Sequence, residues 1–283
     1  AKNTPLIAAW DGAMMGVGSS EWQQCAYGLN QTDRPGAVWL KAFTAAMDTA
    51  VRDGARVINV SLGGAELELP WQAMPRSEDE RRTLAASRRI CAAIDRARAA
   101  GVVTVVSSGN SAEEGNPRSV PGLCPAAVEV GAVGPSLERG YFSTYNGRVD
   151  LTAPGVGVLS STPARPATPS APSMHGYEWQ DGTSFASPHV SGVAALLFSG
   201  HPQWNADQVI EALFTSVTDR GIAGRDPEFG RGVLDAAAAV DPVANPAGTV
   251  TSVDAFIPRL RLAANDRGEF AFSFNPPSVH LFS

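Results

Sequence analysis

The stretch from Asp181 to Gly192, D-G-T-S-F-A-S-P-H-V-S-G, delivers a serine at a sharp turn just before an apolar helical run, Val190–Leu197. Pro188 suits an early helix position, because the first turn does not use its missing N–H. Ser184 would then lie near free N–H groups and the positive end of the helix dipole, which favour developing negative charge. The whole string predicts a serine nucleophile rather than a serine that only caps the helix.

This string resembles the nucleophile motif of the subtilases, the subtilisin-like serine peptidases. The resemblance continues in the same order through most of the chain, to about Val240. It implies an α/β fold with a doubly wound, mostly parallel sheet and helices on both faces. It also implies hydrolysis of peptide bonds through an acyl-enzyme on Ser184, by a peptidase domain over residues 1–241.

Two apolar segments predict neighbouring strands of that sheet. The β-branched run at 56–64 closes on two glycines, and the run at 102–106 leads into Ser107-Ser108-Gly109-Asn110. A helical segment between them stops at Gly101. Strand, helix and strand at this spacing indicate a βαβ unit, and ligands of such sheets bind beyond the carboxyl ends of the strands.

The resemblance assigns roles at those strand ends. Asn110 resembles the subtilase asparagine whose amide donates to the oxyanion, although an asparagine after glycine is also a common turn residue. An extended substrate is expected to pair with one strand end, and its primary side chain to enter a pocket walled by the other. These substrate-binding candidates are Ser61, Leu62 and Gly63 on the first strand end, and Ser107, Ser108 and Gly109 on the second.

A serine nucleophile needs a base, which subtilases supply in the chain order Asp, His, Ser. None of the four histidines stands in a His-Gly-Thr context like that of the family's base; they are His175, His189, His201 and His280. In subtilisin roughly 150 residues separate base and nucleophile. With an insertion of roughly twenty residues added, counting back from Ser184 reaches the first residues or just before them. Lys2 or a removed residue falls at that position.

The sequence therefore predicts that the triad Asp and His lie on an upstream segment or a separate partner chain. Asp11, in A-A-W-D-G, resembles an aspartate at a strand end, but its use would require loss of the whole histidine region. Two alternatives remain open. One is a catalytically inactive pseudo-subtilase that binds or scaffolds peptides, and the other is a peptide ligase or cyclase that uses the same acyl-enzyme.

The composition and net charge limit the classes of molecule that this protein is expected to bind. The 283 residues are 44% apolar and 18% charged, as in ordinary soluble proteins, and the net charge of −6 argues against nucleic acid. No apolar stretch is long enough to span a bilayer, and no signal peptide is visible at Ala1, although the chain does not begin with Met. We expect no cofactor; the resemblance allows a structural calcium ion, for which no site is identifiable. It also favours a secreted protein.

The three cysteines are Cys25, Cys91 and Cys124, whose spacing fits no zinc or redox motif. One disulfide is compatible with this count, but the sequence does not choose the pair, and buried free thiols are the more common outcome. The charged stretch Glu66–Arg89 predicts an inserted, solvated loop that leads into a helix. Residues 162–173 predict a loop beside the nucleophile, and residues 242–283 a small β-rich C-terminal extension.

Overall fold

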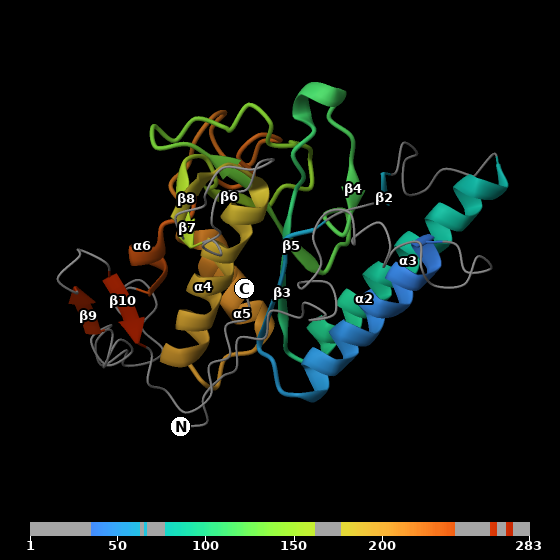
Figure 1. The fold of residues 1–283 in the computed structure, drawn as a ribbon, viewed down its shortest axis with the longest axis horizontal. Helices are drawn as coiled ribbons and strands as arrows, with labels where there is room; N and C mark the ends of the chain where they lie inside the picture. The colour runs from blue at the N-terminus through green and yellow to red at the C-terminus, as the bar shows by residue number, and fades with distance from the viewer. Residues whose placement is uncertain are drawn as a thin grey trace, which may run out of the picture.

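A parallel four-stranded sheet forms the centre of the protein (Figure 1). The computed structural model describes residues 35–62, 65–66, 77–161, 177–240, 261–264 and 270–273. The strands are β1 (Val57–Val60), β3 (Val103–Ser107), β5 (Ala127–Val133) and β6 (Leu151–Pro154), in the order β1-β3-β5-β6. Every neighbouring pair is parallel. The predicted mostly parallel sheet is confirmed.

Helices cover both faces of the sheet, as predicted. One face carries α2 (Pro35–Arg52) and α3 (Glu78–Ala99), which pack side by side. The other carries α4 (Thr183–Gly200), α5 (Ala206–Thr215) and the short α6 (Ala236–Val240). Because alternate residues of a strand point to opposite faces, Val57 and Val105 join the core under α4, whereas Ile58 and Val106 join the core under α2 and α3.

The first residues of α2 and α3 suit a helix start, and α3 begins earlier than the sequence predicts. Helix α2 starts at Pro35, and proline favours the first helical position because its missing N–H is not needed there. Helix α3 starts at Glu78, so the second half of the charged stretch Glu66–Arg89 is helical and not a loop. Glu78 is the first residue of α3, where the helix dipole favours negative charge.

Smaller elements complete the described part. Strand β2 (Ala65–Glu66) pairs with β4 (Ser119–Val120), and β7 (Val158–Ser161) pairs with β8 (Tyr177–Gln180), both antiparallel. A 3-10 turn spans Ala112–Glu114. The predicted loop at 162–173 lies outside the described residues. In the proposed C-terminal extension, β9 (Arg261–Ala264) and β10 (Phe270–Ser273) form an antiparallel pair, and the boundary near 241 stays a prediction.

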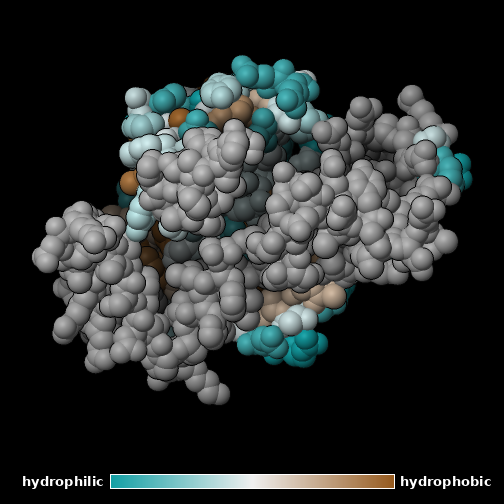
Figure 2. Space-filling model, viewed as in Figure 1, coloured by the Kyte–Doolittle hydropathy of each residue, from teal (hydrophilic) through white to brown (hydrophobic). Residues whose placement is uncertain are grey.

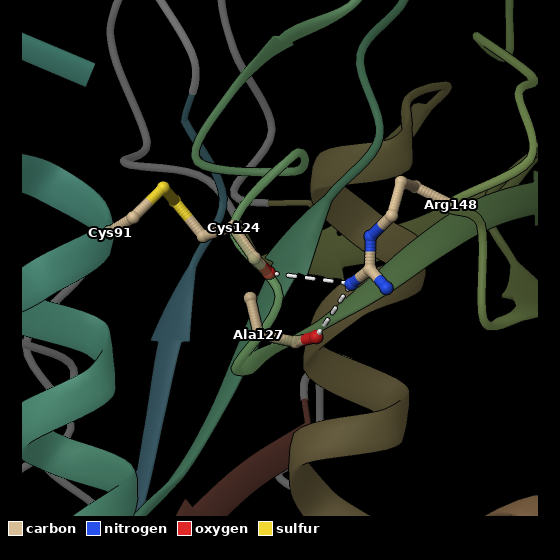
Figure 3. Close-up of a disulfide and its surroundings, with 4 residues drawn as sticks. All are labelled: Cys91, Cys124, Ala127 and Arg148. Atoms are coloured by element: carbon tan, nitrogen blue, oxygen red, sulfur yellow. Dashed lines mark hydrogen bonds between the residues drawn. A yellow bond between two sulfur atoms is a disulfide. The ribbon is translucent and has the colours of Figure 1, made fainter. Parts of the chain in front are cut away.

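A disulfide joins Cys91 of α3 to Cys124, in the segment before β5 (Figure 3). The expectation of free thiols is therefore wrong for these two residues, and Cys25 lies outside the described residues. The pair closes a loop of sequence separation 33, because α3 packs against the segment that enters β5. The same segment is held from its other side by Arg148, whose guanidinium donates to the carbonyls of Cys124 (3.3 Å) and Ala127 (3.4 Å).

In the view of Figure 2, the described residues that reach the surface are mostly hydrophilic, with only scattered hydrophobic ones. Within the ranges that the structure describes, no helix combines the length and the apolar character needed to cross a membrane.

Candidate active site

Ser184 is the second residue of α4, and the chain reaches it through a tightly packed turn. The N–H of Gly182 donates to the carbonyl of Gly155 at 2.8 Å. A Cβ on Gly155 would lie 2.6 Å from the Cβ of Ala132 and 2.8 Å from the carbonyl of Gly182, so only glycine allows this approach. The first N–H groups of α4 have no acceptor within the helix. Half-buried Ser184 therefore lies at a helix start that favours negative charge.

Asn110 is bound to the residue next to Ser184. Its side-chain oxygen accepts from the Thr183 N–H at 2.9 Å and from the Thr183 hydroxyl at 2.8 Å. The Thr183 hydroxyl in turn accepts from the N–H of Gly109 at 3.2 Å. Because a backbone N–H can only donate, the atom facing Thr183 must be the amide oxygen. The NH2 group of Asn110 therefore points away from Thr183. Asn110 itself is exposed.

A cavity of about 400 Å³ lies between the strand ends and the start of α4. Five of the residues singled out in the sequence line it: Leu62, Ser107, Gly109, Asn110 and Ser184. The other five are Thr183, which belongs to the string around Ser184, and Ser111, Pro117, Ser119 and Thr144. Four of these come from segments after β3 that carry no motif of their own. None of these ten described lining residues carries a charge.

Two of the predicted substrate-binding residues, Ser108 and Ser61, do not line this cavity. Ser108 does not line the cavity; it is buried, and its hydroxyl donates to the carbonyl of Thr144 at 2.9 Å. The chain alternates here, so Ser107 and Gly109 face the cavity and Ser108 does not. Ser61 lies beside Ser184, but its hydroxyl is turned to α4 and donates to the Ser184 carbonyl at 2.8 Å. Gly63 lies outside the described residues.

The described residues place no base beside the Ser184 hydroxyl, which donates to the carbonyl of Ser61 at 3.3 Å. The exposed His189 contacts the carbonyl of Phe185 through Nδ1 at 2.8 Å. His201 is buried and stacks on Trp204, with 3.7 Å between the ring centres. The remaining candidates lie outside the described residues: Lys2, Asp11, His175 and His280. In the described part there is also no group of three or more His, Cys, Asp or Glu residues that could hold a metal ion.

Comparison with known sequences gives a consistent set of relatives. The model of the subtilase family matches residues 26–232. Subtilisin DY of Bacillus licheniformis is 30% identical over 215 residues, which are 75% of this chain and 67% of that protein. Alkaline elastase YaB of Bacillus sp. (strain YaB) is 32% identical over 213 residues, 75% of this chain and 47% of that protein. The chain thus spans about half to two thirds of the length of these relatives.

Solved structures show the same likeness. A lanthipeptide protease matches with a TM-score of 0.59 and 26% identity, over 71% of this chain and 65% of that one. Fervidolysin of Fervidobacterium pennivorans, a keratinolytic enzyme related to subtilisin, matches with a TM-score of 0.56 and 28% identity, over 71% of this chain and 29% of that one. The predicted subtilisin-like α/β fold is confirmed.

Proposed function

Because the chain belongs to the subtilase family, we propose that it is a serine endopeptidase of the subtilisin type, with Ser184 as nucleophile and Asn110 as oxyanion donor. The observation that carries this proposal is the pair of hydrogen bonds from Thr183 to the Asn110 side-chain oxygen. They bind the amide to the residue that precedes the nucleophile. Asn110, whose NH2 group is not used by Thr183, and Ser184 both line the same cavity.

The chemistry follows from these positions. The Ser184 oxygen attacks the carbonyl carbon of the scissile peptide bond, and its proton passes to a base. The carbonyl oxygen becomes an oxyanion, which accepts a hydrogen bond from the Asn110 NH2 group. The base returns its proton to the leaving amine, and water then hydrolyses the ester on Ser184. Before this attack the Ser184 hydroxyl donates to the Ser61 carbonyl, at 3.3 Å.

The substrate we propose is an extended polypeptide that pairs with the strand end Ser61-Leu62-Gly63. Its primary side chain enters the cavity of about 400 Å³ beside Ser184, where none of the described lining residues is charged. A charged side chain would lose hydration there without gaining a counter-charge. We therefore expect medium to large apolar side chains at the cleaved bond. Profiling with a peptide library tests this, and a strict requirement for a charged residue would contradict it.

We further propose that an upstream segment or a separate chain supplies the triad Asp and His. Without a base, a serine keeps the high pKa of an ordinary alcohol and is a poor nucleophile. The contact of the Ser184 hydroxyl with a backbone carbonyl fits a nucleophile whose base lies elsewhere. The same contact also favours the second candidate function, a pseudo-subtilase that binds peptides. Transfer of the acyl group to an amine, as in a ligase or cyclase, differs only in the final acceptor.

Fluorophosphonate labelling separates these functions. We expect the 283-residue chain alone to label slowly, and the chain joined to its upstream segment to label rapidly at Ser184, with Ser184→Ala as the control that abolishes labelling. Rapid labelling of the chain alone would place the base within it, and His175 and Lys2 would be substituted first. Failure of both forms to label, with peptide binding intact, would favour the pseudo-subtilase. Product analysis with an added amine distinguishes ligation from hydrolysis.

We propose that the protein acts outside the reducing cytosol. Its disulfide between Cys91 and Cys124 is of a kind that persists in oxidising compartments. A relative from Dichelobacter nodosus, 33% identical over 192 residues, is named an extracellular basic protease. Recovery of the protein from the culture medium, with these two thiols blocked to alkylation, would support this location. Recovery from cells with both thiols alkylated would contradict it.

A further inference from the structure

The backbone carbonyl of Ser184 lacks its normal helical partner. In an α-helix the carbonyl of residue i accepts from the N–H of residue i+4. For Ser184 that residue is Pro188, which lies inside α4 and has no N–H. A carbonyl left unpaired in a half-buried position costs free energy, so a donor from another element is needed here.

Ser61 supplies that donor from the sheet. Its hydroxyl lies 2.8 Å from the Ser184 carbonyl, across a sequence separation of 123. The alternation of β1 explains the placement. Val57 faces the core under α4, and residues two and four positions further on point the same way. Asn59 and Ser61 therefore face α4 at the level of its first turns.

The hydrogen-bonding capacity of the Ser61 hydroxyl is completely used. A serine hydroxyl has one proton to donate and two lone pairs to accept. The proton goes to the Ser184 carbonyl, which can only accept. Asn59 Nδ2 donates to Ser61 Oγ at 2.8 Å, and the contact with Ser187 Oγ at 2.8 Å must then be a donation from Ser187. The buried Ser191 hydroxyl lies 3.0 Å from Asn59 Oδ1 and 3.1 Å from the Ser187 carbonyl, so its one proton is shared between these two acceptors.

Ser61 also contacts the Ser184 side chain, because the Ser184 hydroxyl donates to the Ser61 carbonyl at 3.3 Å. One residue thus contacts both the main chain and the side chain of the nucleophile. We propose that Ser61 is a positioning residue: its hydroxyl replaces the helix N–H that Pro188 lacks and fixes the backbone from which Ser184 attacks. This inference rests on the proposed function. It differs from a substrate-binding role, because the Ser61 side chain does not line the cavity.

A double-mutant cycle with Pro188 tests this role in the protein that carries its upstream segment. Ser61→Ala removes the donor, and we expect the maximal rate of fluorophosphonate labelling to fall about tenfold, equivalent to 1.36 kcal/mol. The concentration for half-maximal rate should stay unchanged, because the cavity is intact. Ser61→Thr keeps the hydroxyl and should retain the rate. Pro188→Ala restores a helix N–H, so in that background Ser61→Ala should cost less than about threefold.

A matched control removes a similar hydrogen bond elsewhere. The Ser216 hydroxyl donates to the carbonyl of Leu213 at 3.3 Å, at the end of α5 and in a half-buried position. Ser216→Ala should leave both the maximal labelling rate and its concentration dependence unchanged. A rise in the half-maximal concentration for Ser61→Ala, with an unchanged maximal rate, would indicate substrate binding and would overturn the positioning role.

A second double-mutant cycle measures stability in urea and does not depend on labelling activity. In a Ser184→Ala background the carbonyl of residue 184 is still present, so the urea midpoints of Ser61→Ala, Pro188→Ala and the double variant report on the same hydrogen bond. We expect Ser61→Ala to lower the midpoint clearly less when Pro188 is also replaced. Additive midpoints would overturn the inference. Failure of the proposed function would instead appear as absence of labelling in the unsubstituted protein.

Discussion

Glu129 is a carboxyl group in the centre of β5, and its replacement should change how stability depends on pH. Only 1% of the residue is exposed. Burial raises the pKa of Glu129 to about 7, from 4.5 for an unburied glutamate. The hydrogen bond from Asn146 Nδ2 to its Oε1, at 3.1 Å, opposes this change. The other oxygen, Oε2, has no hydrogen-bond partner among the described residues.

Some charged neighbours of Glu129 raise its pKa and others lower it. Asp150 raises the pKa of Glu129 further, while Arg148 and Arg225 lower it. Asp150 itself lies within 4 Å of three arginines, Arg148, Arg225 and Arg231. Burial nevertheless raises the pKa of Asp150 as well. Because Arg148 and Arg225 are already engaged by Asp150, they compensate only part of the cost of a charge on Glu129.

The sign of the effect follows from proton binding. Between pH 4.5 and about 7 the unfolded chain loses the Glu129 proton while the folded protein keeps it, so stability falls as the pH rises through this range. At 1.36 kcal/mol per pH unit, the interval corresponds to a loss of about 3 kcal/mol, complete above pH 7. Glu129→Gln keeps the shape and the neutral form but cannot ionise, so it should escape this loss.

Urea unfolding from pH 4.5 to 8.5 measures the effect. The stability difference between Glu129→Gln and the unsubstituted protein should increase by about 3 kcal/mol up to pH 7 and then stay level. Glu114→Gln, in the exposed 3-10 turn, is the matched control and should show no comparable trend. A difference for Glu129→Gln that does not vary with pH would refute the reasoning, because it would mean that the buried carboxyl titrates as it does in the unfolded chain.

Three further outcomes are expected. Asn110→Ala should slow acylation of Ser184 by about 10² to 10³-fold, measured as the labelling rate of the complete protein; a loss below tenfold would remove Asn110 from the oxyanion site. Replacing both Cys91 and Cys124 by alanine opens a loop of separation 33 and should cost about 3 to 4 kcal/mol of unfolding free energy in urea; an unchanged midpoint would contradict the link. Gly155→Ala should slow labelling of Ser184, since its Cβ would approach the Gly182 carbonyl to 2.8 Å, and a normal rate would show that the turn tolerates the shift.

The elements that carry the site are largely predictable from the sequence, because they depend on short-range patterns. The β-branched run at 56–64 and the continuous apolar run at 102–106 contain β1 and β3. The string around Ser184 marks the start of α4, since its turn residues and its apolar helical run are adjacent in the chain. The serines of α4 that face β1 could also be predicted from their spacing. Ser184, Ser187 and Ser191 lie three and four residues apart, which places them on one face of a helix.

Only the tertiary structure decides which of these elements meet. Sequence spacing offers three pairings for three cysteines, and the packing of α3 on the segment before β5 selects Cys91 and Cys124. The cavity walls at Pro117, Ser119 and Thr144 carry no local signal, because they approach Ser184 only through folding. The same holds for the Ser61 hydroxyl. The sequence reveals that Pro188 leaves a helix carbonyl without a donor, but a residue 123 positions away provides that donor only because β1 packs against α4.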